Sequence, residues 1–139
     1  IHINIIGDTE VFKDSELGDL IAEVTSMNLA ADALQANIAI NYGGRAELVR
    51  AANLAFAQKG RPITEEDIRD NLYTAGQPDP ELVIRTSGEY RLSGFMLWQC
   101  SYSELVFSDC LWPDFSKEEL LGAIAEFQSR ERRFGGVKK

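Results

Sequence analysis

Apolar and polar residues alternate along the chain in two rhythms, one typical of strands and the other of helices. Compact apolar or β-branched runs, which predict buried strands, occur at residues 1–6, 37–42, 81–85 and 104–107. Apolar residues spaced three or four positions apart predict helices at residues 15–31, at residues 45–58, after residue 64 and after residue 116. Strands that alternate with helices in this way predict an α/β fold with a mostly parallel sheet flanked by helices.

Capping residues mark the ends of these predicted helices. Asp14 or Ser15 is expected to cap the first helix, and Gly60 is expected to end the second. Thr64–Asp67 is close to a capping box, and Ser116–Glu119 is a complete one. The apolar stripe that the second helix is expected to bury consists of Leu48, Val49, Ala52, Ala55 and Phe56.

Length and composition predict one domain, or part of one, over residues 1–139. A chain of 139 residues can bury most of a hydrophobic core, and it shows no repeat, low-complexity tract or convincing domain boundary. Because the chain begins at Ile1, without Met and inside a predicted strand, we expect a fragment that lacks its N-terminal part. The formal net charge of -8 opposes general binding of nucleic acid, which requires a basic face.

Cysteine spacing and hydropathy predict a cytoplasmic protein. Cys100 and Cys110 match neither a disulfide scaffold nor a metal-binding spacing, so we interpret them as reduced, buried thiols. No apolar run approaches the ~20 residues of a membrane span. The sequence also shows no signal peptide.

The segment from Arg85 to Glu104 carries the candidate chemistry. Arg85 follows a predicted strand, at the carboxyl end where ligands bind in open parallel sheets. The guanidinium groups of Arg85 and Arg91, with hydroxyl donors such as Ser93, suit a phosphate or diphosphate. The alternative for Arg85 is an ion pair with Glu81 or Glu89 at the rim of the sheet.

Three further features each allow more than one interpretation. Glu104 is either a ligand for a divalent cation that bridges phosphates or a solvent-facing carboxylate at a strand start. The turn Gly43–Gly44 either points backbone N–H groups at an anion or only lets a strand and a helix pack closely. The arginines Arg130, Arg132 and Arg133 either offset a helix macrodipole or form a basic tail or a dimer contact.

Six short motifs follow one another in a fixed order along the chain. They are N-Y-G-G-R at Asn41–Arg45, I-R-T-S-G-E-Y-R-L-S at Ile84–Ser93, W-Q at Trp98–Gln99, S-E-L at Ser103–Leu105, W-P-D-F at Trp112–Phe115 and R-E-R-R-F-G-G at Arg130–Gly136. In this order they resemble the C-terminal part of the cis-prenyltransferases, most closely the bacterial undecaprenyl diphosphate synthases. Any single motif is weak, but the ordered set is very specific and spans nearly the whole chain.

This resemblance implies a transferase that condenses isopentenyl diphosphate with farnesyl diphosphate in successive Z additions. The product would be undecaprenyl diphosphate, the lipid-carrier precursor of peptidoglycan synthesis. The residues that match substrate-binding positions of the family are Arg85, Arg91, Leu92 and Ser93, with Arg132 and Arg133 as weaker candidates. Glu104 matches a Mg²⁺ ligand. The resemblance also implies a homodimer that contacts the inner face of the membrane through its lipid product.

The chain departs from the family pattern in three places. Tyr90 stands where many bacterial members have His, and Gly94 stands where Asn is common. The family's first motif, of the form D-G-N-G-R-W, is absent, and it supplies an aspartate that binds Mg²⁺. We therefore expect no catalytic residue within residues 1–139, and no activity from these residues alone. The alternatives are a non-catalytic partner subunit of a prenyltransferase complex and an unrelated phosphate-binding α/β module.

Overall fold

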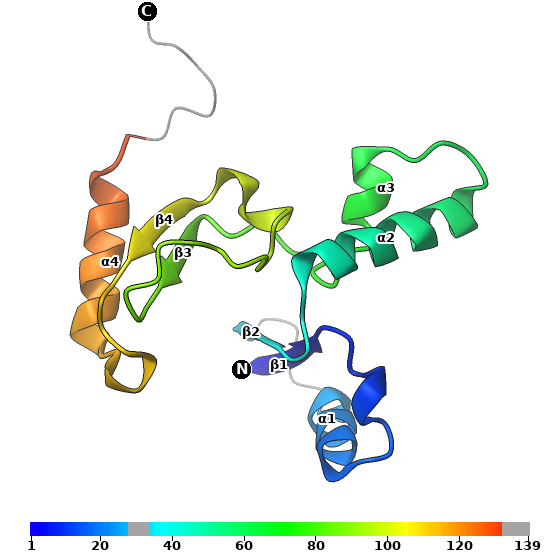
Figure 1. Cartoon of the computed structure of the whole chain (residues 1–139), viewed down its shortest axis with the longest axis horizontal. Helices are drawn as coiled ribbons and strands as arrows, with labels where there is room; N and C mark the ends of the chain where they lie inside the picture. Colours follow the sequence, from blue (N-terminus) through cyan, green and yellow to red (C-terminus); the bar gives the residue numbers. More distant parts are fainter. Residues whose placement is uncertain (28–33, 132–139) are drawn as a thin grey trace, which may run out of the picture. The chain divides into compact units, whose positions relative to one another are not determined.

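The computed structural model has the predicted α/β class, with parallel strand pairs and helices packed beside them (Figure 1). It describes residues 1–27 and 34–131. The chain divides into two compact units, Ile1–Gln77 and Pro78–Lys139. The division falls in the proline-containing connector that follows Gln77.

The first unit is built on two parallel strands. β1 pairs with β2 in a register that runs from His2 opposite Gln35 to Ile6 opposite Ala39. The elements of this unit are, in chain order, β1 (His2–Ile6), η1 (Glu10–Phe12), α1 (Glu16–Ser26), β2 (Gln35–Ala39), α2 (Gly44–Lys59) and α3 (Glu65–Arg69). β2 therefore begins two residues before the predicted run. The last residues of the first predicted helix, 28–31, lie outside the described residues.

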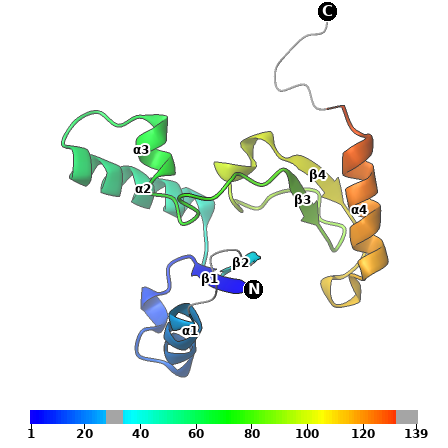
Figure 2. The same cartoon turned by 180° about the vertical axis from the view of Figure 1, so that it is seen from behind.

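Helix α1 packs beside β1, as both views show (Figure 1, Figure 2). Of the two expected capping residues, Ser15 caps the helix, because its Oγ accepts a hydrogen bond from Gly18 N at 3.3 Å. Apolar side chains of α1 and of the strand pair line an open cavity of about 190 Å³. At the end of β1, Gly7 has a φ of 124°, and a Cβ there would lie 2.0 Å from Ile40 O. Only glycine fits this close approach of two backbones.

The end of α2 and the start of α3 follow the predicted capping signals. Gly60 ends α2 in the left-handed conformation, with a φ of 62°. Thr64 and Asp67 form a reciprocal capping box at the start of α3. The Asp67 carboxylate also forms an ion pair with Arg61, in which Nη1 lies 2.9 Å from Oδ2. These contacts lower the pKa of Asp67 to about 2, mainly because the backbone N–H of Thr64 stabilises the carboxylate.

The predicted buried stripe of α2 is wrong in part. Ala55 is buried as expected, but Val49 and Phe56 are 63% and 60% exposed. The residues that α2 buries are small or polar, namely Gly44, Glu47, Ala51 and Ala55. The helix contacts α3, and small side chains on the buried face allow two helices to approach closely.

The second unit repeats the pattern of a parallel strand pair with one helix beside it (Figure 1, Figure 2). Its elements are, in chain order, β3 (Leu82–Arg85), η2 (Gln99–Tyr102), β4 (Glu104–Phe107), η3 (Trp112–Asp114) and α4 (Lys117–Ser129). Ser116 caps α4, because its Oγ accepts from Glu119 N at 3.3 Å. The Glu119 carboxylate accepts a hydrogen bond from Ser108 Oγ at 3.1 Å and so ties the start of α4 to the end of β4.

Candidate diphosphate and metal site

The loop that follows β3 is held against the segment after β4 by backbone hydrogen bonds. Ser108 N donates to Arg85 O at 2.9 Å, at the end of the strand pair. Ser87 N then donates to Cys110 O at 2.8 Å, and Gly88 N donates to Ser108 O at 3.1 Å. These bonds fix the backbone from Arg85 to Gly88, at the carboxyl end of β3.

Several residues of this loop have left-handed backbone conformations. The φ angles are 69° at Ser87, 50° at Ser93 and 43° at Met96, and they are 65° at Gly88 and 80° at Gly94. A non-glycine residue in this region costs about 1–3 kcal/mol and persists only where its surroundings enforce it. Such residues cluster at ligand-binding and catalytic sites, so the backbone supports a functional role for the loop.

The two predicted guanidinium groups differ in their contacts. Among the described residues, the half-buried Arg85 forms no ion pair with Glu81 or Glu89, so that alternative interpretation is wrong. Glu89 instead forms an ion pair with Arg91, whose side chain is 66% exposed. Arg85 is therefore available to an anionic ligand. Arg91 would bind such a ligand either while it keeps its ion pair with Glu89 or after that ion pair breaks.

Leu92 and Ser93 lie in a turn that presents the serine to solvent. Phe95 N donates to Leu92 O at 2.9 Å and closes this turn. Ser93 is exposed, and Leu92 is half-buried. Both stay predicted substrate-binding residues. The weaker candidates, Arg132 and Arg133, lie outside the described residues.

Tyr90 and Gly94 are the two residues of this loop that depart from the family pattern, and the structure shows the contacts of the first and the backbone conformation of the second. Tyr90 Oη donates a hydrogen bond to Asp109 Oδ1 at 2.9 Å, and its ring lies 5.2 Å from the ring of Phe107. The hydrogen bond and the negative charge of Asp109 raise the pKa of Tyr90 above its ordinary value. At Gly94, asparagine would also tolerate the left-handed backbone, so glycine there preserves the turn. No pattern in the sequence indicated Asp109 as the partner of Tyr90.

The strand pair separates Glu104 from Arg85. Glu104 is the first residue of β4 and lies opposite Leu82, whereas Arg85 lies opposite Phe107. Three residues of a strand span about 10 Å, and residues three apart point to opposite faces. The ladder therefore places the candidate metal ligand and the first candidate arginine at opposite ends, and on opposite faces, of the two strands.

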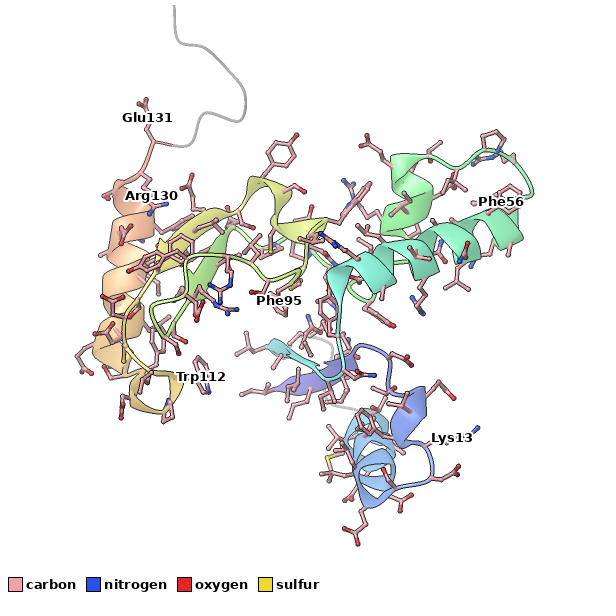
Figure 3. All side chains as sticks on the ribbon, viewed as in Figure 1. Lys13, Phe56, Phe95, Trp112, Arg130 and Glu131 are labelled. Atoms are coloured by element: carbon pink, nitrogen blue, oxygen red, sulfur yellow. The ribbon has the colours of Figure 1, made fainter. Side chains whose placement is uncertain are left out.

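Glu104 is held by an arginine that follows α4. Arg130 Nη1 donates to Glu104 Oε2 at 2.8 Å, and Arg130 Nη2 donates to the carboxylate of Glu126. Figure 3 shows Arg130 at the C-terminal end of α4. The hydrogen bond to Glu104, and then that to Glu126, raise the pKa of the guanidinium. Arg130 thus binds two carboxylates, a role that neither interpretation of the arginine cluster had included.

A divalent cation at Glu104 would find no cluster of three or more protein ligands among the described residues. Among residues 1–27 and 34–131, no group of three or more His, Cys, Asp or Glu side chains could hold a metal ion. Mg²⁺ commonly takes one or two carboxylates and completes its shell with substrate phosphates and water. The described contacts of Glu104 engage Oε2, so the arrangement is compatible with one further ligand bond.

The surroundings of the turn Gly43–Gly44 oppose the anion-binding interpretation. A cavity of about 440 Å³ lies beside it, at the ends of β1 and β2, and its lining includes three carboxylates and one arginine. One of these carboxylates, on the buried Glu47, accepts a hydrogen bond from Tyr73 N at 2.8 Å and another from Tyr42 Oη. An excess of negative charge opposes an anion at the helix start. A Cβ at Gly43 would meet no atom within 4 Å, so close packing does not require glycine at that position either.

Comparison with known proteins identifies the family. Residues 1–135 match the family described as "Putative undecaprenyl diphosphate synthase". The chain belongs to this prenyltransferase family. The family membership predicted from the motif order is confirmed, and an unrelated phosphate-binding module is excluded.

Curated relatives of the chain are named isoprenyl transferases. The protein from Listeria monocytogenes is 44% identical over 143 residues, which cover 99% of this chain and 56% of that protein. The protein from Bacillus subtilis is 47% identical over 145 residues, which cover 99% of this chain and 55% of that protein. The chain thus spans about half the length of the curated relatives that it matches.

Solved structures confirm the fold class. The crystal structure of a probable undecaprenyl diphosphate synthase from Campylobacter jejuni matches with a TM-score of 0.83 and 38% identity, over 96% of this chain and 62% of that chain. Lavandulyl diphosphate synthase from Lavandula x intermedia, in complex with dimethylallyl diphosphate, matches with a TM-score of 0.85 and 35% identity, over 96% and 60% of the two chains. Both are similar to this chain in fold and in sequence.

Proposed function

We propose that the full-length protein carrying this sequence is a cis-prenyltransferase that adds isopentenyl diphosphate units to farnesyl diphosphate. In each addition the allylic carbon–oxygen bond breaks, diphosphate leaves, a new carbon–carbon bond forms and one proton is lost. Repeated Z additions would give undecaprenyl diphosphate for peptidoglycan synthesis. The family match over residues 1–135 is the observation that carries this proposal.

The loop after β3 supports the binding of isopentenyl diphosphate in this reaction. Arg85 lies at the carboxyl end of its strand without a carboxylate partner among the described residues. Arg91 and Ser93 follow in the same loop, in which Ser87 and Ser93 have positive φ angles. Planar guanidinium groups bind phosphate oxygens through two parallel hydrogen bonds, which gives both strength and orientation.

Mg²⁺, a second copy of the chain and a cytoplasmic location complete the proposal. Mg²⁺ would neutralise charge that develops on the leaving diphosphate, with Glu104 as one of its ligands. The homodimer rests on the resemblance alone. No helix among the described residues is long and apolar enough to cross a membrane. Contact with the inner face of the membrane would come from the lipid product.

Incorporation of labelled isopentenyl diphosphate tests the function. The full-length protein should extend farnesyl diphosphate in the presence of Mg²⁺ and lose this activity when the metal is chelated. A folded protein that incorporates no label would contradict the enzyme and favour the non-catalytic partner subunit. Retention of Arg85, Arg91 and Glu104 favours the enzyme, because partner subunits typically lose such residues.

A second allylic substrate should be assayed in parallel. The Lavandula enzyme, which is 35% identical to this chain, was solved with dimethylallyl diphosphate. Acceptor length is decided by the part of the site that binds the hydrocarbon, whereas the diphosphate requires the same groups in either substrate. The ratio of kcat/KM for the two acceptors therefore decides which is the natural one.

A further inference from the structure

The ion-pair cluster of Arg130, Glu104 and Glu126 holds the candidate metal ligand in place. We propose that Arg130 is a positioning residue that orients the Glu104 carboxylate for a divalent cation. The inference rests on the proposed function, because it takes Glu104 as a Mg²⁺ ligand. Arg130 itself would contact neither the metal ion nor the substrate.

The course of the backbone around Arg130 allows this contact. α4 lies along β4 and ends at Ser129, and Arg130 follows it in an extended conformation with φ -83° and ψ 138°. Arg130 N donates to Phe127 O at 3.2 Å, and this bond holds the backbone of Arg130 to the last turn of the helix. From this position the side chain reaches Glu104, the first residue of β4.

The two carboxylates use different parts of the guanidinium group. Nη1 contacts Glu104, and Nη2 contacts Glu126, which lies one helical turn earlier on α4. Because Glu126 restrains the guanidinium from the helix side, the direction of the hydrogen bond to Glu104 is also restrained. A planar group with several fixed donors is suited to such bridging, whereas a lysine ammonium is not.

Partial burial makes the arrangement effective. The side chain of Arg130 is 33% exposed and that of Glu104 is 28% exposed, so water competes only in part for the hydrogen bond. The contact engages Oε2 of Glu104. Groups that hydrogen-bond to a metal ligand fix its orientation, and their loss typically weakens metal affinity about 10–100-fold.

Binding of Mn²⁺, as a paramagnetic substitute for Mg²⁺, tests the proposal directly. In the full-length protein with isopentenyl diphosphate present, Arg130→Gln should weaken Mn²⁺ binding about tenfold or more, as measured by electron paramagnetic resonance. Arg130→Lys should restore part of the affinity. In activity assays the Mg²⁺ concentration for half-maximal rate should rise, while kcat at saturating Mg²⁺ should change little.

A matched control separates positioning from general destabilisation. Arg61→Gln breaks another arginine–carboxylate pair, that with Asp67 in the first unit, and should leave Mn²⁺ affinity unchanged. Thermal melting identifies any variant that fails to fold. If Arg130→Gln does not fold, the comparison of Arg130→Lys with the parent protein supplies the test.

The remaining outcomes distinguish this inference from the proposed function. If Glu104→Gln abolishes Mn²⁺ binding while folded Arg130→Gln and Arg130→Lys bind it like the parent protein, the positioning role is wrong and the metal site stands. Tighter binding by Arg130→Gln would also overturn the inference, because Arg130 would then compete with the cation. If Glu104→Gln binds Mn²⁺ normally, the metal role of Glu104 fails, and the inference fails with it.

Discussion

Tyr90 Oη donates a hydrogen bond to Asp109 Oδ1 at 2.9 Å, which links the loop after β3 to the segment after β4. The carboxylate stabilises the protonated phenol and repels the phenolate, so the pKa of Tyr90 lies above its ordinary value of 10.0. Tyr90 therefore stays neutral at physiological pH and acts there as a hydrogen-bond donor. A histidine at this position would instead titrate near neutrality.

Asp109→Asn should lower the pKa of Tyr90 toward its ordinary value. The substitution removes the negative charge that opposes ionisation of the phenol. Tyrosinate absorbance in the near ultraviolet, followed against pH, measures the change. The same titration of Tyr90→Phe identifies the contribution of this tyrosine. An unchanged high-pH titration in Asp109→Asn would show that the hydrogen bond does not govern Tyr90.

Arg85→Ala should raise the KM for isopentenyl diphosphate far more than that for farnesyl diphosphate. A charge-assisted hydrogen bond contributes ~1.5–3 kcal/mol, which corresponds to roughly a tenfold to hundredfold change. Steady-state kinetics with each substrate varied in turn measure both constants. Arg69→Ala, at an exposed position on α3, is the matched control. Equal increases for both substrates would show that Arg85 serves a different diphosphate.

Asp67 should stabilise the fold at neutral pH and lose that effect in acid. Its pKa falls from 3.8 to about 2 on folding, so its contribution is fully present above 3.8 and disappears as the pH falls toward about 2. Asp67→Asn should therefore lower the free energy of unfolding at pH 7, and the difference from the parent protein should shrink over that acidic range. Urea denaturation at several pH values measures it. A difference that does not vary with pH would point to lost packing alone.

Gly7→Ala should destabilise the protein by more than ~1 kcal/mol, whereas Gly122→Ala should stabilise it by about 0.5–1 kcal/mol. A Cβ at Gly7 would lie 2.0 Å from Ile40 O, and its φ of 124° is unsuited to alanine. A Cβ at Gly122, inside α4, would meet no atom within 4 Å. Urea denaturation of both variants measures the two changes. A stable Gly7→Ala would show that β1 and the end of β2 can separate at little cost.

Local sequence signals predicted the secondary structure well. β4 has the predicted bounds, Ser15 and Ser116 cap their helices, and Gly60 ends α2. Each signal acts over a few residues, so it can be read without knowledge of the rest of the fold. Burial is different, because it depends on which element lies opposite. Periodicity could not show that α2 buries Ala51 and Ala55 rather than its larger apolar side chains.

The candidate site was predicted in its residue types but not in its contacts. The carboxylates of Glu104 and Glu126 lie 26 and 4 positions from Arg130. Only the second spacing is a helical signal that the sequence offers. The positive φ angles of Ser87 and Ser93 could not be predicted from the sequence either, because serine rarely adopts such angles. Such features arise from tertiary contacts.

The left-handed residues of the loop after β3 also bear on ligand affinity. Hydrogen bonds from Ser87 N and Gly88 N to the segment after β4 hold the first part of this loop before any ligand arrives. A flexible loop would lose conformational entropy on binding, and that loss would weaken the complex. In this loop the free-energy cost of the positive φ angles of Ser87 and Ser93 arises when the protein folds, and not when a ligand binds. The first part of the loop is therefore preorganised, and a ligand at Arg85 would meet a backbone that needs little reordering.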